Sequence, residues 1–316
     1  MPSYDLKEIN NRIKTDSKEF LRDSDALLHQ SVIVAADSIK NHMKTCPIVL
    51  LSGPSGSGKT TMSKMMEKEL DSQGVSTVTI SMDNYFLSID PETTPRTQSG
   101  EYDLESPKCL DMDLINEHFA AIMKGEIIRI PHFTFATQKR STSRFTPLRL
   151  KENEIVIFEG IHALDDEITK AHPETFKLFI SASSGFNLDG KPIFESTWLR
   201  LIRRIVRDDN FRGSSAELTL RMWQNVLRGE RLYIDPNIYK ADIALDTTLP
   251  YEVSLMKRYA EPLLRKLPDK YTDQQELEKI LSSFPFFESI NPALVGPGSL
   301  LREFIGGSEY YGDNKG

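Results

Sequence analysis

The sequence contains little cysteine and no long apolar run, and each absence excludes a class of protein. Only Cys46 and Cys109 occur among 316 residues, without a CxxC pair or a His/Cys cluster at metal-ligand spacing. We therefore expect two reduced thiols, and neither a disulfide framework nor a structural zinc site. No run of about 18 apolar residues could span a bilayer, and the N-terminus lacks the apolar core of a signal peptide. These absences predict a soluble, cytoplasmic protein with no membrane partner.

The chain also has no excess of basic residues. It carries 39 Lys and Arg against 46 Asp and Glu, a formal net charge of −7 at pH 7. Binding to phosphates along a nucleic acid normally needs a basic surface, so we expect no nucleic-acid partner. An acidic protein can still hold one small anion in a locally basic pocket. The rest of the composition, 39% hydrophobic and 27% charged, is typical of a globular protein with a substantial core.

Short apolar runs alternate with helical patterns from residue 47 onward. The apolar runs predict buried strands at 47–52, 75–81, 154–160, 176–182 and 241–247. Amphipathic patterns predict helices at 60–70, 112–124, 195–209, 214–231 and 251–266. The intervening segments predict a long loop at 84–110 and a hairpin at 126–151. This alternation predicts an α/β fold of three layers, with a mostly parallel sheet covered by helices on both faces.

Three parts are expected along the chain. A polar, helix-compatible stretch at 1–45 predicts a helical N-terminal extension, and the α/β pattern occupies 46–270. The composition changes near residue 271, so 271–316 is predicted to be a C-terminal extension. Its segment SLLREFIGGS (299–308) is apolar and contains glycine, which suits packing on the central domain or on a neighbouring subunit. The sequence leaves both arrangements open, and with them a homo-oligomer.

The sequence GPSGSGKT at 53–60 fits the spacing G-x-x-x-x-G-K-[ST] of a phosphate-binding loop. It follows a predicted strand and opens a predicted helix, so backbone N–H groups at the helix N-terminus can surround a phosphate. Lys59 is expected to contact the β- and γ-phosphates, and the Thr60 hydroxyl to bind Mg²⁺. The residues expected to bind the nucleotide are Gly53, Ser55, Gly56, Ser57, Gly58, Lys59, Thr60 and Thr61.

The phosphate loop alone does not separate kinases from GTPases, ATPases or regulators. A guanine-specific N-K-x-D motif is absent, apart from Asn314 and Lys315 at the end of the chain, so a GTPase is discounted. Asp83 follows one predicted strand and Glu159 follows the apolar run of another, at the edge where open α/β sheets bind ligands. Asp83 could accept the proton of an attacking hydroxyl, and Glu159 could face Mg²⁺. By position alone, either could instead be a turn, cap or exposed strand-end residue.

Five further segments carry a resemblance to a known family. They are ISMDNYF (80–86), YDLESPKCLDMDLI (102–115), IPHFTFATQKR (130–140), IVIFEGIHAL (155–164) and RLIRRIVRDDNFRG (200–213). Together with the phosphate loop, and in the same order, they resemble the uridine/cytidine kinases of the phosphoribulokinase/uridine kinase group. The similarity runs from about Pro47 to Lys257, well over half of the chain.

The resemblance implies a P-loop kinase with a β-hairpin insertion and a helical lid, which uses ATP and Mg²⁺. Its small-molecule acceptor would be a nucleoside, uridine or cytidine, phosphorylated on the 5′-hydroxyl. Asp83 is implied as the general base, Asp103 as the ligand of the ribose hydroxyls, and Thr60 with Glu159 as the Mg²⁺ ligands. The other acceptor-binding residues implied are Tyr85, Phe133, Phe135, Gln138, Arg140 and Arg207.

The lid segment is rich in arginine. Arg200, Arg204 and Arg207 recur at i, i+4 and i+7, and an apolar side faces the other way. Phosphoryl transfer spreads negative charge over the transferred group, so guanidinium groups that close over it would stabilise the transition state. We assign Arg204 and Arg207, with Lys59, to catalysis, and Arg203 and Arg212 to nucleotide binding. A solvated helix face is the other interpretation of this spacing.

The hairpin departs from the family pattern at one position. In the register set by its flanking residues, the aromatic positions of the base pocket become Phe133 and Phe135, and the pyrimidine-reading histidine becomes Gln138. Phenylalanine can stack on a base, and glutamine can both donate and accept hydrogen bonds. Simple packing of the hairpin is the other interpretation of the two phenylalanines.

Two rival functions stay open. A kinase of the same fold could phosphorylate another hydroxyl compound, such as a sugar phosphate or a polyol, and Gln138 keeps this alternative open. A non-catalytic, nucleotide-binding regulator is suggested by the N-terminal extension and the C-terminal tail. The predicted carboxylates and arginines argue against a regulator, because together they form a complete set of groups for phosphoryl transfer.

Overall fold

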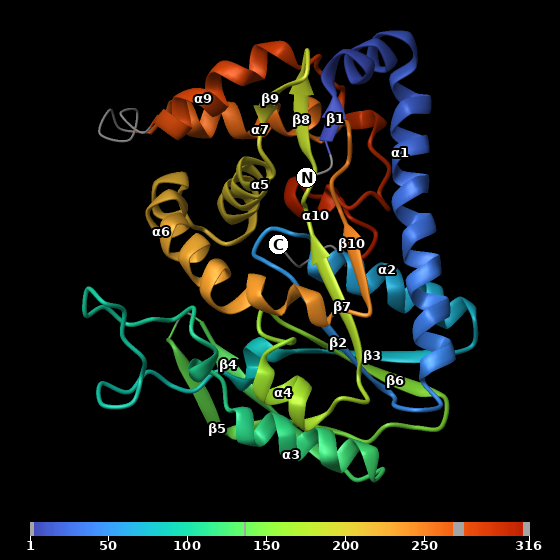
Figure 1. Ribbon diagram of the computed structural model, residues 1–316, viewed down its shortest axis with the longest axis vertical. Helices are drawn as coiled ribbons and strands as arrows, with labels where there is room; N and C mark the ends of the chain where they lie inside the picture. The colour runs from blue at the N-terminus through green and yellow to red at the C-terminus, as the bar shows by residue number, and fades with distance from the viewer. Residues whose placement is uncertain (1–2, 136, 268–274, 312–316) are drawn as a thin grey trace.

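A parallel sheet of five strands crosses the centre of the molecule (Figure 1). Its strands are β2 (Ile48–Ser52), β3 (Ser76–Ser81), β6 (Glu154–Glu159), β7 (Phe176–Ser181) and β10 (Ile243–Asp246). They lie in the order β10-β7-β2-β6-β3, and every neighbouring pair is parallel. The computed structural model describes residues 3–135, 137–267 and 275–311. The predicted α/β fold with a mostly parallel sheet is confirmed.

Helices cover both faces of this sheet. Successive residues of a strand point to opposite faces, so Val49 and Leu51 of β2 join one core while Ile48 and Leu50 join another. The helices in the first core are α1 (Leu6–His42), α2 (Lys59–Ser72), α5 (Ser196–Phe211) and α7 (Glu252–Arg265). The second core is shared with α3 (Met112–Met123), α4 (Asp166–Ala171) and strand β4 (Ile128–Thr134). Burial on both faces explains why the strands appear in the sequence as continuous apolar runs.

The predicted N-terminal helix is α1, which runs along one side of the molecule and packs against α2 (Figure 1). The Asp5 carboxylate accepts the backbone N–H groups of Lys7 and Glu8 and so caps the start of the helix. The helix is kinked at Asp16, where φ is −156° and ψ is 91°. Its apolar residues belong to the same core as the sheet, so α1 is an integral part of the helical layer.

The segment between β3 and α3 is mostly irregular, as its composition predicts. Short 3₁₀ turns occur at Met82–Tyr85 (η1) and Pro107–Cys109 (η2). Asp111 caps α3 through its carboxylate, which accepts the backbone N–H of Leu114. Strand β4 then pairs with β5 (Lys139–Leu148) in the predicted antiparallel hairpin.

The lid and the C-terminal segment complete the helical layer on the first face. The elements beyond α5 that are not yet named are α6 (Ala216–Gly229), η3 (Glu230–Ile234), η4 (Asp235–Lys240), α9 (Gln275–Ser283), η5 (Phe284–Phe286), η6 (Pro292–Leu294) and α10 (Arg302–Ile305). The domain boundary predicted near residue 271 lies outside the described residues. Leu301 and Phe304 are fully buried in the same core as α5 and α7. The segment SLLREFIGGS could have packed on the central domain or on a neighbouring subunit. In the structure it packs on the central domain.

A second, small sheet is not predicted by the sequence. It contains β1 (Ser3–Asp5), β8 (Gly185–Leu188) and β9 (Lys191–Phe194) in the order β1-β8-β9. Strands of three or four residues show too few alternations to be recognised from hydrophobic periodicity. Within the described parts of the chain, we find no helix with the length and apolar character needed to cross a bilayer.

Candidate active site

The phosphate loop connects β2 to α2, where its spacing predicts it. Gly56 has a left-handed backbone with φ of 77°, and a Cβ there would lie 2.8 Å from the carbonyl oxygen of Arg200. The residue that precedes α2, Gly58, offers no side chain to cap the helix. The first N–H groups of α2 therefore lack an intrahelical partner, at the end where the helix dipole is positive. This arrangement favours an anion at the start of α2.

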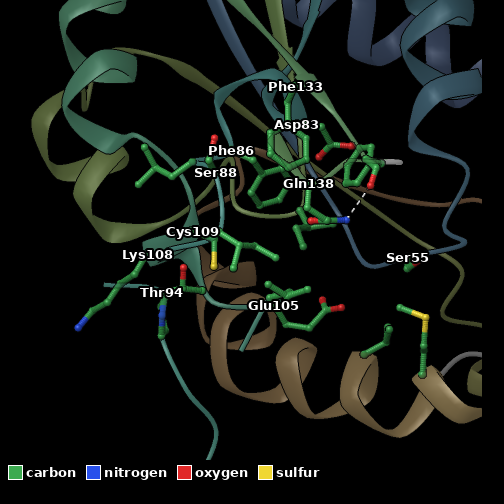
Figure 2. Close-up of a pocket in the computed structure, with 18 of the residues that line it drawn as sticks. Ser55, Asp83, Phe86, Ser88, Thr94, Glu105, Lys108, Cys109, Phe133 and Gln138 are labelled. Carbon is green, nitrogen blue, oxygen red and sulfur yellow. Dashed lines mark hydrogen bonds between the residues drawn. The ribbon is translucent and has the colours of Figure 1, made fainter. Parts of the chain in front are cut away.

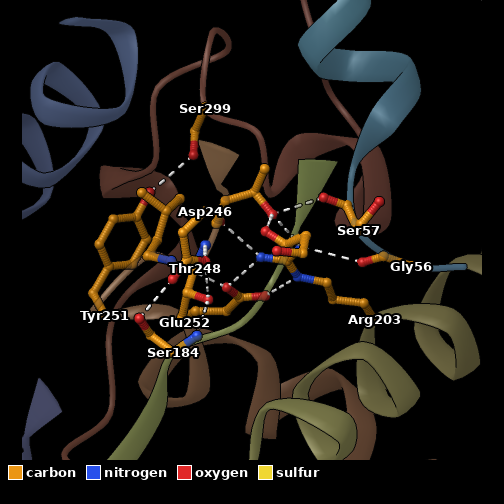
Figure 3. Close-up of polar contacts among 12 residues, drawn as sticks. Gly56, Ser57, Ser184, Arg203, Asp246, Thr248, Tyr251, Glu252 and Ser299 are labelled. Carbon is orange, nitrogen blue, oxygen red and sulfur yellow. Dashed lines mark hydrogen bonds and ion pairs between the residues drawn. The ribbon is translucent and has the colours of Figure 1, made fainter. Parts of the chain in front are cut away.

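A buried polar network supports the phosphate loop from beneath (Figure 3). Arg203 has no exposed surface and forms an ion pair with Glu252. Its guanidinium also donates to the carbonyl oxygens of Gly56 at 3.1 Å and Thr247 at 3.0 Å. The Thr247 hydroxyl donates to the carbonyl oxygen of Ser57 at 2.7 Å. Because these partners engage its guanidinium, Arg203 shapes the loop, and its predicted role as a nucleotide ligand does not fit this position.

Lys59, Asp83 and Glu159 come together at the carboxyl edge of the sheet. Glu159 ends β6, and its Cα pairs in register with that of Ser81, just before the turn that carries Asp83. Burial lowers the pKa of Lys59 and raises the pKa values of Asp83 and Glu159, while attraction between the opposite charges opposes these shifts. The lysine therefore interacts electrostatically with both carboxylates, so the predicted phosphate ligand and the predicted base belong to one site.

The predicted magnesium ligands, Thr60 and Glu159, also lie together. The Thr60 hydroxyl lies close enough to the Glu159 carboxyl to lower its pKa, and Thr60 is exposed. Mg²⁺ commonly takes one or two protein oxygens together with waters and phosphate oxygens, so this pair fits an ion held beside a triphosphate. Within the described residues, no group of three or more His, Cys, Asp or Glu side chains could hold a metal alone. The Ser57 hydroxyl oxygen in the loop is buried without a hydrogen-bond partner in these residues, as expected where a phosphate would bind.

The lid arginines of α5 differ in what they contact. Arg204 donates to the Ser55 hydroxyl at 3.0 Å and lines the cavity described below. Arg207 donates twice to Asp208, at 2.9 and 2.7 Å, and lies close enough to Lys59 to lower the pKa of that lysine. Arg212 is more exposed, lines the same cavity and lowers the pKa of Asp83 by its charge. Three predicted arginines therefore surround the site, and sequence reasoning missed Asp208, which orients them.

Arg200, by contrast, serves the fold. It forms a two-point ion pair with Glu230, at 2.6 and 2.8 Å, and donates to the carbonyl oxygen of Ser55 at 3.1 Å. Its side chain is almost fully buried. The helical spacing of Arg200, Arg204 and Arg207 therefore does not place all three on the reacting groups.

A cavity of about 470 Å³ opens beside Asp83 and the lid (Figure 2). Its apolar wall includes Phe86, Phe133 and Phe135, whose ring centroids lie 5.3 to 6.0 Å apart. Gln138 lines the cavity next to them and has a left-handed backbone with φ of 52°. Its amide nitrogen donates to the carbonyl oxygen of Phe135 at 3.0 Å, as the dashed line in Figure 2 shows. The predicted aromatic positions therefore form a wall, to which the structure adds Phe86.

Three other predicted acceptor residues make protein contacts of their own. Tyr85 is fully buried and hydrogen-bonds His118 at 2.8 Å. Arg140 forms an ion pair with Asp111 at 2.7 Å, which ties the hairpin to the start of α3. The carboxylate of Asp103 accepts hydrogen bonds from Arg228 of α6 at 2.5 Å and from Tyr233 of η3 at 2.8 Å. These contacts position the walls of the cavity, and a direct contact of these residues with an acceptor stays a prediction.

Glu105 is a site residue that sequence reasoning missed. It lines the cavity, and its carboxylate makes no hydrogen bond with another residue in the described parts of the chain. Burial raises the pKa of Glu105, and the nearby charge of Arg204 lowers it. A Cβ at position 229 would lie 2.5 Å from the Cβ of Glu105, so Gly229 permits this close approach. The signal in the sequence was weak, an acidic residue two positions after Asp103 in the predicted loop.

The sequence of this chain is similar to a known protein family and to individual proteins of known activity. Residues 48–253 match the model of the family described as Phosphoribulokinase / Uridine kinase family. A uridine kinase of Staphylococcus aureus (strain JH9) is 26% identical over 204 residues, which covers 64% of this chain and 88% of that protein. The matched residues include the phosphate loop, the hairpin and the lid. The C-terminal segment that carries α9 and α10 lies beyond them.

Solved structures with a related fold are more distant. A putative fructose transport system kinase from Silicibacter sp. TM1040 is 20% identical, covers 63% of this chain and 88% of that chain, and has a TM-score of 0.48. A possible uridine kinase from Bacillus stearothermophilus is 16% identical over the same shares of the two chains, with a TM-score of 0.43. Likeness at this level says nothing about the acceptor.

Proposed function

The chain belongs to the Phosphoribulokinase / Uridine kinase family, and on that basis we propose that it phosphorylates the 5′-hydroxyl of a pyrimidine nucleoside, uridine or cytidine, with ATP. As a member of this family it is a kinase, a phosphotransferase that acts on a hydroxyl group. The observation that carries the proposal is one cavity beside the phosphate loop, where an aromatic wall and the lid arginines meet Asp83 and Glu105, whose carboxylates accept no hydrogen bond from the described residues. Such a cavity suits an acceptor with a flat apolar ring and several hydroxyl groups.

Asp83 is the proposed general base. Its carboxylate lies beside Lys59 and Arg212, at the point where the cavity meets the phosphate loop. An acceptor hydroxyl that hydrogen-bonds to Asp83 passes its proton to the carboxylate as its oxygen attacks the γ-phosphorus of ATP. The bond from the γ-phosphorus to the bridging oxygen breaks, and ADP leaves with the electron pair.

The charge that develops on the transferred group is met by cations of this chain. Lys59 approaches the phosphates from the loop, and Arg204 and Arg207 approach from the lid. Thr60 and Glu159 would hold Mg²⁺ on the phosphate side, where the bound ion would offset the charge of the phosphate oxygens. Closure of the lid would also exclude water from the transferred group.

The other end of the cavity is proposed to read the nucleoside. Phe86, Phe133 and Phe135 offer ring faces and edges for a base. Because the amide nitrogen of Gln138 is already bound to Phe135, its oxygen remains to accept from the base. The N3–H of uridine and the N4 amine of cytidine are both donors that could use it. Glu105 is proposed to accept from a sugar hydroxyl.

An acceptor screen tests the proposal. ADP release with ATP and Mg²⁺ would be measured across pyrimidine and purine nucleosides, sugars, sugar phosphates and polyols. We expect turnover with uridine or cytidine, and phosphorus NMR of the product should identify a 5′-monophosphate. Silence with every nucleoside beside activity on a sugar would reject the pyrimidine acceptor in favour of the sugar or polyol kinase. ATP binding without transfer to any acceptor would favour the non-catalytic regulator.

A further inference from the structure

The C-terminal segment at 299–311 reaches the phosphate loop from outside the region that matches the family. Its helix α10 packs against α5. Leu300 and Phe304 are almost completely buried, which anchors the backbone of the segment in the core. A Cβ at Gly58 would lie 3.0 Å from a methyl group of Leu300, so the segment touches the loop where α2 begins. It therefore borders the proposed donor site as a fixed part of the fold.

Glu303 of α10 binds the start of α2 directly. One carboxylate oxygen of Glu303 accepts the backbone N–H of Thr61 at 3.3 Å and the Thr61 hydroxyl at 2.5 Å. The Tyr311 hydroxyl lies 3.2 Å from the same Thr61 oxygen. The Thr61 N–H belongs to the first turn of α2 and has no partner within the helix. The carboxylate thus occupies a position where an N-terminal helix end attracts an anion.

The charge of Glu303 also reaches the other groups of the phosphate site. The negative charge favours the charged forms of Lys59 and Arg212. It disfavours the charged form of Glu159, whose pKa it raises. The Glu303 carboxylate therefore partly neutralises three groups that a triphosphate would use, namely Lys59, Arg212 and the N–H of Thr61.

We propose that Glu303 is an internal competitor of the donor nucleotide, whose carboxylate holds the Thr61 N–H in the free protein and turns away when a triphosphate binds. The inference rests on the donor site of the proposed function. One N–H cannot donate fully to a carboxylate and a phosphate together, and two anions at one helix end repel each other. Because Leu300 and Phe304 hold the backbone, only the Glu303 side chain has to rotate.

Direct binding of phosphate-bearing probes tests the competition without relying on turnover. Titration calorimetry on the full chain would compare wild type, Glu303→Gln and Glu309→Gln, with ADP and with inorganic tripolyphosphate as probes. The matched control, Glu309, lies on the same segment but pairs with Lys68. Glutamine can still accept the Thr61 N–H, so Glu303→Gln removes the charge and leaves the contact. We expect Glu303→Gln to bind both probes about tenfold more tightly, and Glu309→Gln to match wild type.

The possible results separate this inference from the proposed function. Unchanged binding by Glu303→Gln would overturn the competition, and weaker binding would make Glu303 a ligand of the nucleotide instead. In either case, ADP binding by wild type that is lost in Lys59→Ala would leave the donor site standing. Failure of all these proteins to bind ADP or tripolyphosphate would overturn both proposals. A thermal melt checks that each variant is folded.

Discussion

Asp83, the proposed general base, is a carboxylate that burial would leave poorly stabilised without the charges of Lys59 and Arg212. We expect Asp83→Asn to lower kcat by about a hundredfold or more, because an amide cannot accept the proton of the attacking hydroxyl. ADP binding should change little, since the proposed contacts of its phosphates are with the loop and the lid. Steady-state kinetics and calorimetry would check both. Asp90→Asn, on the exposed part of the same loop, is the control, and near-normal turnover of Asp83→Asn would reject the base assignment.

Glu105 is the carboxylate that we expect to select the acceptor. A hydrogen bond to a charged group contributes about 1.5 to 3 kcal/mol, so Glu105→Gln should raise the acceptor KM at least tenfold with little change in the KM for ATP. Gly229→Ala should act in the same direction, because the added Cβ would displace the Glu105 side chain. Kinetics with both substrates varied would test this, with Glu101→Gln on the exposed loop as control. Equal changes in both KM values would contradict a selective role.

His162 provides a prediction about stability and pH. Its side chain is buried, and burial lowers its pKa to about 4 from an unfolded value of about 6.5. The unfolded chain therefore binds this proton first as the pH falls. Stability present above pH 6.5 is lost between 6.5 and 4, by about 2 kcal/mol at pH 5.

Urea unfolding of wild type and His162→Phe at pH 7.5 and pH 5 would measure this loss. The free energy of unfolding of wild type should fall by about 2 kcal/mol relative to the variant between these two pH values. The buried carboxylates Asp83 and Glu159 titrate in both proteins, so the difference isolates the histidine. An equal pH dependence in both proteins would mean that His162 is not held neutral by burial.

At the residue scale, sequence patterns predict which residues carry the chemistry, but they predict less well where each side chain points. Lys59, Asp83 and Glu159 could be predicted because motif spacing and strand ends place them at one edge of a parallel sheet. Arg203 and Arg204 are neighbours on one helix, and only tertiary contacts decide that the first faces Glu252 and the second the cavity. Helical spacing alone could not separate them.

Among the helices and strands, too, some could be predicted from the sequence and others could not. Strands β2, β6 and β7 were predictable because burial on both faces makes most of their residues apolar. The small sheet of β1, β8 and β9 was missed because its strands are too short to show a period. Helix α10 has only four residues and was not predicted as a helix. Its contribution comes from packing, since the ring of Phe304 lies under the guanidinium of Arg203 at 5.2 Å.

That packing makes α10 necessary for stability. We expect Phe304→Ala to lower the free energy of unfolding by about 3 to 5 kcal/mol, as other large-to-small changes in cores do. Phe286→Ala removes the same atoms from a ring that is 52% exposed, and it should cost less than about 1 kcal/mol. Urea denaturation would measure both. Similar, small losses in the two variants would show that α10 does not contribute to the core.

At the scale of the whole molecule, the three parts that composition suggests share one hydrophobic core. Apolar residues of α1, of the sheet and of α10 belong to a single cluster. Composition marks where the chain changes character, but it cannot show that segments at opposite ends meet in space. The extension at the N-terminus and the described part of the extension at the C-terminus therefore pack on the same face of the sheet as α2.

This shared core predicts that the chain does not fold without its C-terminal segment. A chain ended at residue 267 would lose buried side chains such as Leu277, Phe287 and Leu301, and would expose the faces of α5 and α7 that they cover. We expect it to be insoluble or to lack a cooperative thermal transition, while the full chain unfolds in one transition. Circular dichroism melts and ADP titration of both chains would compare them. A soluble truncated chain that melts cooperatively and binds ADP would contradict the shared core, because its helices would then be stable without the segment that covers them.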